Sequence, residues 1–255
     1  MLENKTIIST RPIQSDKPLI DLLQKDGAKY ISMPMIEPVL SILNPAEKAI
    51  LSNIEQFDWL IFTSGNGVRF FFEQLEKFQI PKVFPDTLKT AVIGKSTAKE
   101  LLRHGLQPAF VGKGKTSADL ANEIQSQFGV GSQPKLLIAQ GNLASPVLEN
   151  KLSKVSRINR IIVYNTLTPK NVSVESLQRI INNDYDLILL ASPSALNNLC
   201  AILAPLQAAE LRLACIGPTT QKAVEKLGAI SELVANESTS LGMYKSIKDY
   251  FDKKN

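Results

Sequence analysis

The feature that most constrains this 255-residue chain is a set of sequence blocks that occurs twice in the same order. DWLIFTSGNGVRFF at 58–71 corresponds to DLILLASPSALNNL at 186–199. AVIGKSTAKELLRHG at 91–105 corresponds to ACIGPTTQKAVEKLG at 214–228, and 112–124 corresponds to 235–247. Two generic β-α units can resemble each other through shared fold rules alone. Three matched blocks in one order favour a duplicated architecture instead.

Short β-branched runs alternate with longer amphipathic stretches throughout the chain. Strands are expected at 6–10, 29–35, 58–64, 89–94, 107–112, 135–141, 160–167, 186–192, 211–217 and 230–235, and helices at 18–27, 45–57, 66–78, 95–105, 116–128, 145–155, 173–183, 194–203, 219–228 and 239–253. Apolar strands that alternate with helices indicate parallel sheets covered by helices, which is the α/β class. The strands are too many for one small sheet, so we expect two sheets in two domains.

Composition excludes several kinds of function. The formal net charge is +5 and aromatic residues make up 6%, with no long basic run, so nucleic acid is not an expected partner. The single histidine, His104, cannot complete a zinc site and is expected to be structural at a helix end. Cys200 and Cys215 lie in apolar stretches and are expected to be reduced core residues.

Several segments and motifs are absent from the sequence. The beginning of the sequence has no apolar signal region, and no apolar run approaches a membrane span, so we expect a cytoplasmic protein without a membrane partner. The phosphate-binding, dinucleotide-binding, zinc-protease and nucleophile-elbow motifs are also missing.

Small and hydroxyl residues follow the expected strands at the points where helices begin. They are Thr63, Ser64, Asn66, Gly94, Ser96, Thr97, Ser192, Ser194, Gly217, Thr219 and Thr220. A helix N-terminus presents unpaired N–H groups and a partial positive charge, and small residues let an anion approach them. The alternative for any one loop is simple N-capping. Four such loops, two in each half, predict a large ligand with several negative groups in a cleft, without a metal.

Five segments together resemble the uroporphyrinogen-III synthase family. They are STRP (9–12), FTSGNGV (62–68), AVIGKSTAKELLRHGL (91–106), VYNT (163–166) and IGPTTQKAVEKLG (216–228), and the resemblance covers essentially the whole chain. It implies two flavodoxin-like lobes with parallel sheets, joined by a two-stranded connector. Residues 1–35 plus 170–255 would form a discontinuous first lobe and 42–162 the second, with connectors at 36–41 and 163–169.

The resemblance implies a reaction as well. The family cyclises the linear tetrapyrrole hydroxymethylbilane to uroporphyrinogen III, with inversion of ring D and loss of water. It is a lyase reaction of tetrapyrrole and heme biosynthesis that uses no cofactor or metal. The eight carboxylates of the substrate match the anion-binding loops. A monomer with transient contact to the preceding pathway enzyme is expected.

The resemblance also assigns roles to residues. Tyr164 is the expected catalytic residue, as a hydrogen-bond donor to the departing hydroxyl. The expected substrate-binding residues are Thr63, Ser64, Asn66, Gly94, Ser96, Thr97, Gly141, Ser192, Ser194, Gly217, Thr219, Thr220 and Arg11. Two positions depart from the family pattern, because Gln140 replaces an arginine found in many relatives and Ala191 replaces a threonine. Arg11 has an alternative role as a solvated charge at a strand end.

A second function remains open on the residues alone. Duplicated α/β lobes with anion-binding loops also suit a cytosolic bilobal binding protein for a small polyanionic ligand. Both functions predict polar loops at strand ends, so the fold does not separate them.

Overall fold

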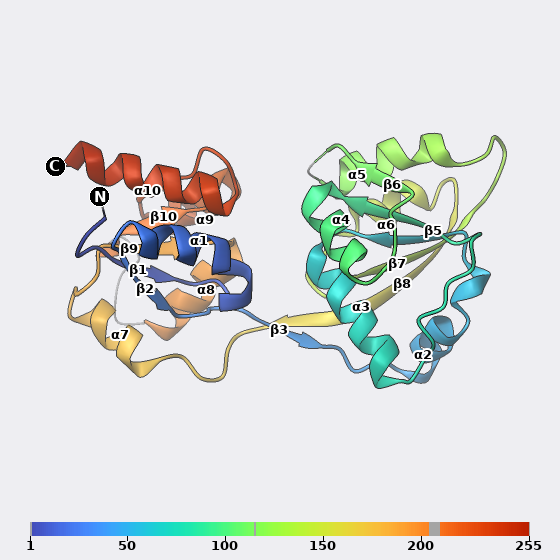
Figure 1. Cartoon of the computed structure of the whole chain (residues 1–255), viewed down its shortest axis with the longest axis horizontal. Coiled ribbons are helices and arrows are strands. Elements are labelled where there is room, and N and C mark those ends of the chain that lie inside the picture. Colours follow the sequence, from blue (N-terminus) through green and yellow to red (C-terminus); the bar gives the residue numbers. More distant parts are fainter. Residues whose placement is uncertain (1, 115, 204–209, 255) are drawn as a thin grey trace. The chain divides into compact units, whose positions relative to one another are not determined.

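Two sheets organise the computed structural model, which describes residues 2–114, 116–203 and 210–254 (Figure 1). The chain divides into two units. Unit 1 contains residues 1–37 and 167–255, and unit 2 contains residues 38–166. Residues 38–41 and 163–166, which the sequence places in connectors, therefore belong to unit 2.

Unit 1 is built on a five-stranded sheet with the order β11-β10-β9-β1-β2. Its elements are β1 (Thr6–Ser9), α1 (Ile13–Lys25), β2 (Lys29–Ser32), α7 (Val174–Ile181), β9 (Leu187–Leu190), α8 (Pro193–Ile202), β10 (Leu213–Cys215), α9 (Pro218–Lys226), β11 (Ser231–Val234) and α10 (Ser240–Lys254). The neighbouring strands are all parallel. This is the flavodoxin strand order.

Unit 2 is built on a six-stranded sheet with the order β3-β8-β7-β4-β5-β6. Its elements are β3 (Glu37–Leu40), α2 (Pro45–Ser52), β4 (Trp59–Phe62), α3 (Gly65–Lys77), β5 (Lys89–Ile93), α4 (Gly94–Arg103), β6 (Phe110–Gly112), α5 (Ser117–Ile124), β7 (Lys135–Gly141), α6 (Val147–Leu152) and β8 (Arg157–Leu167), with short 3-10 helices at Ile54–Gln56 and Gln125–Gln127. Four of the neighbouring pairs are parallel. The arrows of β3 and β8 run in opposite directions (Figure 1).

The repeated blocks occupy equivalent places in the two sheets. Strands β4, β5 and β6 of unit 2 follow one another in space as β9, β10 and β11 do in unit 1. The remaining places are taken by β7 and β8 in unit 2 and by β1 and β2 in unit 1. Unit 2 thus reaches the flavodoxin arrangement with its first two strands placed last along the chain.

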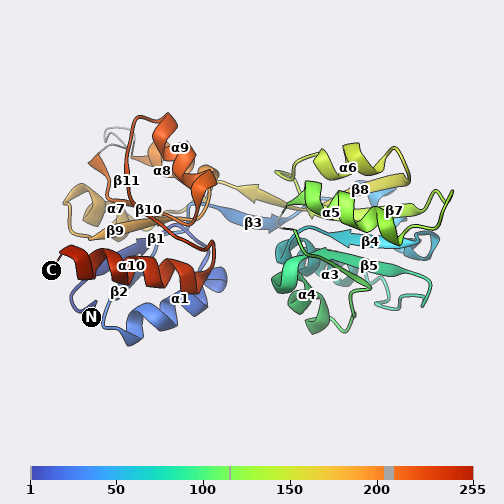
Figure 2. The ribbon, with the colours of Figure 1, turned by 90° about the horizontal axis from the view of Figure 1, so that it is seen from above.

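Helices cover both faces of each sheet (Figure 2). In unit 2, Leu60, Phe62 and Val92 face one core with helices α2, α3 and α4, whereas Trp59 and Ile61 face a second core with α5 and α6. Unit 1 repeats the arrangement, with α1 and α10 on one face and α8 on the other. Strands buried on both faces explain the continuous apolar runs in the sequence.

The start of one expected helix differs from the structure. The helix expected from residue 18 begins at Ile13 and contains Pro18 in its interior. The expected start at residue 18 was based on the preference of proline for a first helical turn. Residues 37–40, which the sequence places in the two-stranded connector, form β3, the edge strand of the unit 2 sheet. Within the described ranges, no helix is both long enough and apolar enough to cross a membrane.

Candidate functional site

The strand order predicts one ligand-binding position on each sheet. Ligands of open α/β sheets bind beyond the carboxyl ends of the strands, where the order of the strands reverses. That point lies between β1 and β9 in unit 1 and between β7 and β4 in unit 2. Each unit therefore has its own candidate position for a ligand.

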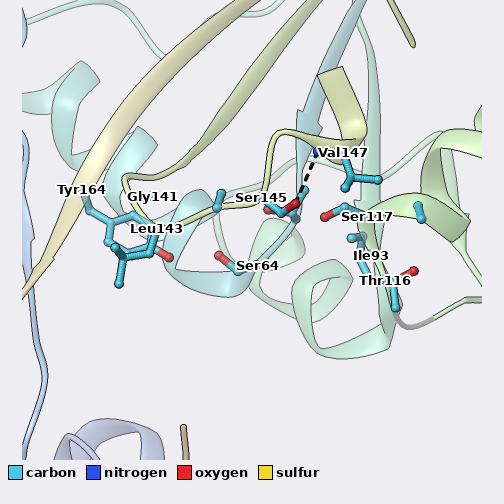
Figure 3. A pocket seen from close by; sticks show the side chains of 12 residues that line it. Ser64, Ile93, Thr116, Ser117, Gly141, Leu143, Ser145, Val147 and Tyr164 are labelled. Carbon is cyan, nitrogen blue, oxygen red and sulfur yellow. Dashed lines mark hydrogen bonds between the residues drawn. The ribbon is translucent and has the colours of Figure 1, made fainter. Parts of the chain in front are cut away.

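A hollow of about 510 Å³ lies at this point of unit 2. It is lined by Thr63, Ser64, Ile93, Thr116, Ser117, Ala118, Gly141, Leu143, Ala144, Ser145, Val147 and Tyr164. In the view of Figure 3, Tyr164 lies at one end of the hollow, Thr116 and Ser117 lie toward the other end, and Ser64 lies between them. Of the described residues, those that line the hollow carry hydroxyl and apolar groups and no charge.

Ser64 enters the hollow because it begins helix α3. Its backbone is extended, and its Oγ accepts a hydrogen bond from the N–H of Gly67 at 3.1 Å. A Cβ at Gly67 would lie 3.0 Å from the carbonyl oxygen of Ala139 on β7. The glycine therefore lets α3 begin close to the sheet, directly beside the carboxyl end of β7.

Gly141 and Tyr164 form a second close contact at the end of β7. The two residues are paired in register across β7 and β8. A Cβ at Gly141 would lie 2.4 Å from Cζ of Tyr164, so the tyrosine ring occupies the space that a side chain would need. The ring also stacks on Phe70, with 5.1 Å between the ring centroids.

The hydroxyl of Tyr164 is the polar group that this packing positions. It makes no hydrogen bond to any residue in the described ranges. The ring is fixed by Phe70 and Gly141 while the phenol lines the hollow. The arrangement offers one free hydrogen-bond donor to a ligand.

Thr116 and Ser117 line the hollow, although they are not among the residues expected from the sequence. Thr116 is the N-cap of α5, and its Oγ1 accepts from the N–H of Asp119 at 3.1 Å. The corresponding Thr239 accepts from the N–H of Gly242 at 3.0 Å at the start of α10. The third repeated block carries Thr-Ser at this point in both copies, and that signal was sufficient to find them.

Several expected residues of unit 2 lie outside the lining of the hollow. Asn66 is half-buried and Ser96 is exposed, whereas Thr97 is buried on α4 with 3% exposure. Gly94 has a φ of +70°, which favours glycine, and begins α4 without a side-chain cap. The hollow therefore brings together Thr63, Ser64, Gly141 and Tyr164 of the expected set.

Unit 1 places the equivalent loops at its own carboxyl edge. Ser192 is the N-cap of α8, and its Oγ lies 3.0 Å from the Oγ of Ser194. Helix α9 begins after Gly217 without a side-chain cap. Thr219 is exposed there, and Thr220 is buried with 2% exposure.

Arg11 differs from the other expected residues because it carries a charge. Its guanidinium Nη1 lies 3.1 Å from Oδ1 of Asp16, a carboxylate that is completely buried. The Arg11 side chain is 25% exposed. Arg11 is therefore an ion-paired, half-buried side chain, unlike a freely solvated charge at a strand end.

The side chain of Gln140 contacts helix α6. It is buried, and its Nε2 donates to Oε1 of Glu149 at 2.6 Å. Arg160 on β8 reaches the same oxygen, with its Nε at 3.2 Å. The residue that replaces the family arginine is thus a structural partner of Glu149.

His104 and the two cysteines have structural surroundings. His104 stacks on Phe72 with 4.1 Å between the ring centroids, and burial lowers its pKa below the ordinary value. Both cysteines are free thiols, and burial raises the pKa of each, to about 11 for Cys215. Among the residues described, no group of three or more His, Cys, Asp or Glu side chains is arranged to hold a metal ion.

Comparison with known proteins places these features in a family. A model described as "Uroporphyrinogen-III synthase HemD" matches residues 17–245. The chain is 29% identical over 234 residues to "Porphyrin biosynthesis protein HemD" of Ruminiclostridium josui, covering 91% of this chain and 46% of that protein, so it spans less than half of that relative. It is 26% identical to the "Uroporphyrinogen-III synthase" of Synechococcus elongatus over 264 residues, covering 98% and 96% of the two chains.

A solved structure shares the fold. The crystal structure of a mutant uroporphyrinogen III synthase from Thermus thermophilus superimposes with a TM-score of 0.62, at 16% identity, and covers 98% of this chain and 99% of that chain. This likeness confirms the expected α/β fold of two flavodoxin-like lobes with mostly parallel sheets. Because the family model spans most of the sequence, the chain belongs to the uroporphyrinogen-III synthase family.

Proposed function

We propose that this protein cyclises hydroxymethylbilane to uroporphyrinogen III, with inversion of ring D and loss of water, in tetrapyrrole biosynthesis. The observation that carries the proposal is the hollow at the carboxyl edge of unit 2, where the free phenol of Tyr164 lies among serine and threonine hydroxyls. Membership of the family supplies the class of reaction. A linear tetrapyrrole presents the carboxylates that such donors and helix N-termini bind.

The reaction needs little chemistry from the protein. Loss of the hydroxyl group as water leaves an azafulvene, and the pyrrole nitrogens supply the electrons for this step. The substituted carbon of ring D attacks to form a spiro intermediate, which fragments and closes again with ring D inverted. Holding the chain in the conformation for this attack is catalysis by positioning. No cofactor takes part in this scheme, and the reaction is that of a lyase.

Tyr164 has the assigned role of donating a hydrogen bond to the departing hydroxyl. Its ring is held by stacking on Phe70 and by the absence of a side chain at Gly141. A fixed donor stabilises the charge that develops on the leaving oxygen without having to reorganise. Ser64 and Ser117 then serve as donors to the substrate carboxylates, whereas the hydroxyl of Thr116 already donates to Oδ2 of Asp119 at 2.7 Å.

The remaining parts of the proposal concern the surroundings of the enzyme. We place it in the cytoplasm as a monomer, with transient contact to the enzyme that produces hydroxymethylbilane. Hydroxymethylbilane closes spontaneously without inversion, so rapid transfer between the two enzymes would limit that loss.

A coupled cyclisation assay tests the function. Hydroxymethylbilane is generated in place, the product is oxidised, and isomers I and III are separated by chromatography. Predominant isomer III is expected. Isomer I alone, as in a reaction without this protein, would overturn the proposal and favour a protein that only binds a polyanionic ligand.

A further inference from the structure

Unit 1 contains a buried polar cluster of its own, at the carboxyl end of β1. It consists of Ser9, Arg11, Asp16 and Tyr30, which come from the end of β1, the turn after it, the first turns of α1, and β2. Asp16 is completely buried in it. A buried carboxylate costs several kcal/mol unless partners compensate for the lost hydration. The partners of Asp16 therefore indicate what the cluster is built to hold.

Two neutral donors fix one oxygen of Asp16. Ser9 Oγ donates to Oδ2 at 2.5 Å, and the Tyr30 hydroxyl donates to the same atom at 2.8 Å. Burial raises the pKa of Tyr30 well above its ordinary value, so its phenol stays protonated and remains a donor. These two bonds set the orientation of the carboxylate and direct its other oxygen, Oδ1, toward Arg11.

The contact of Asp16 with Arg11 is an ion pair without an aligned hydrogen bond. Nη1 of Arg11 lies 3.1 Å from Oδ1, yet Oδ1 accepts no hydrogen bond from any residue in the described ranges. Within those ranges the guanidinium also has no other acceptor. A guanidinium has five N–H donors, so Arg11 is held by charge while its donors stay available to a ligand.

The backbone beside Arg11 is equally fixed. Thr10 bonds to the carbonyl of Leu189 on β9 through both its N–H, at 3.1 Å, and its Oγ1, at 2.7 Å. The N–H of Arg11 donates to Ser9 Oγ at 3.3 Å. The turn thus lies between β1 and β9, at the point of unit 1 where the strand order reverses.

We propose that Asp16 is a positioning residue, which holds the Arg11 guanidinium at the carboxyl edge of unit 1 so that it binds one carboxylate of the substrate. The inference rests on the proposed function for the identity of that substrate. Asp16 itself does not touch the ligand. Arginine suits the task because its planar fork matches a carboxylate with two parallel hydrogen bonds.

The test is a set of variants of the full chain, analysed by steady-state kinetics and thermal melting. Asp16→Asn keeps the size of the side chain but loses the charge that holds Arg11. We expect it to raise KM for hydroxymethylbilane about tenfold, with kcat changed less than about twofold. Arg11→Gln is expected to raise KM by at least as much.

A double variant separates positioning from a purely structural role. If Asp16 acts only through Arg11, adding Asp16→Asn to Arg11→Gln leaves KM where Arg11→Gln alone put it. Lys5→Gln, the matched control, breaks a different ion pair of unit 1, in which Lys5 Nζ lies 3.4 Å from Oδ1 of Asp186, and is expected to change KM by less than about threefold. An unchanged KM in Asp16→Asn, or a tenfold further rise in the double variant, would overturn the inference.

Two further measurements keep the test decisive. If Asp16→Asn does not fold, Arg11→Lys replaces it, because lysine keeps the charge and loses the fork. A raised KM at an unchanged melting temperature is then expected, and an unchanged KM overturns the inference. Fluorescence titration with uroporphyrin, an octacarboxylate, separates this inference from the proposed function. If the wild type yields only isomer I, the function fails, whereas weaker uroporphyrin binding by Asp16→Asn and Arg11→Gln would still support the positioning role.

Discussion

The carboxyl edges of the two units have the same strand arrangement and different chemistry. Unit 2 presents a hollow whose described lining is neutral, with the phenol of Tyr164 in it. Unit 1 presents Arg11, ion-paired to the buried Asp16. The duplicated sheet therefore fixes where polar groups lie and leaves their chemistry free to differ. We assign the bond-breaking step to unit 2 and the binding of a carboxylate to unit 1.

The opposite edge of unit 2 provides a second comparison. A hollow of about 440 Å³ lies there, beside Asp58, Thr87 and Lys89 at the amino ends of the strands. Its volume is close to that of the carboxyl-edge hollow, at about 510 Å³. Volume alone does not identify the site. The helix N-termini at the carboxyl edge supply the donors that an anion needs.

The largest effect is expected from Gly141→Ala. The new Cβ would lie 2.4 Å from Cζ of Tyr164 and would push the ring out of its place. A displacement of about 1 Å can cost about 100-fold in rate, so we expect at least that loss in kcat/KM. The control is Gly129→Ala, whose Cβ would meet only Ser132, at 3.6 Å or more. Equal activity in the two variants would contradict the role given to the contact between Gly141 and Tyr164.

Tyr164→Phe should have the next largest effect. It removes the hydroxyl and keeps the ring that stacks on Phe70. Losing one hydrogen bond to a developing charge should lower kcat about 10- to 100-fold, with the melting temperature unchanged. Steady-state kinetics and a thermal melt measure both quantities. Wild-type kcat in this variant would remove the assigned role of Tyr164.

Ser64→Ala and Ser192→Ala compare the two units directly. Each serine caps a helix through a similar bond, at 3.1 Å to the N–H of Gly67 and at 3.2 Å to the N–H of Ala195. Each variant should therefore lower the free energy of unfolding of its unit by about 1 kcal/mol, measured by urea titration. Ser64 also lines the hollow, so Ser64→Ala should raise KM more than Ser192→Ala does. The reverse order of KM values would shift the carboxylate-binding role toward Ser192.

The smallest effect concerns the pH dependence of stability. Burial lowers the pKa of His104 in the folded protein, against a weaker opposing effect of Glu100. The unfolded chain therefore takes up the proton at a higher pH than the folded chain. His104 contributes stability above its ordinary pKa, and that contribution is lost as pH falls through the pKa of the folded state.

His104→Gln tests this linkage. The melting temperature of the wild type should fall more than that of the variant between about pH 7.5 and about pH 5.5. Parallel melting curves over this range would contradict the expected linkage.

The sequence predicted the sheets better than it predicted the site. The run WLIF is buried on both faces, and such runs identify parallel strands reliably. The sequence predicted the start of α1 at Pro18, because proline is favoured in a first helical turn. In the structure, Pro18 lies inside a helix that begins at Ile13. The four-residue strand β3 lies at a sheet edge, in the segment that the sequence places in the two-stranded connector.

The site was harder to predict because its contacts join distant segments. No local pattern reveals that the side chain of Tyr164 fills the space above Gly141 or that Asp16 lies behind Arg11. Thr116 and Ser117 did have a signal, since Thr-Ser recurs in the second copy of the block. Their place in the hollow follows from the neighbouring positions of β4, β5 and β6 in the sheet.

The most direct measurement is the isomer composition of the product formed by a hollow variant and a matched control. The hollow variant combines Tyr164→Phe with Ser117→Ala, neither of which caps a helix. The control is Thr87→Ala, at the opposite edge of the same sheet. We predict predominant isomer III from the wild type and the control, and a shift toward isomer I in the hollow variant. Isomer III in undiminished proportion and at an undiminished rate from the hollow variant would contradict the claim that the carboxyl edge of unit 2 is the active site.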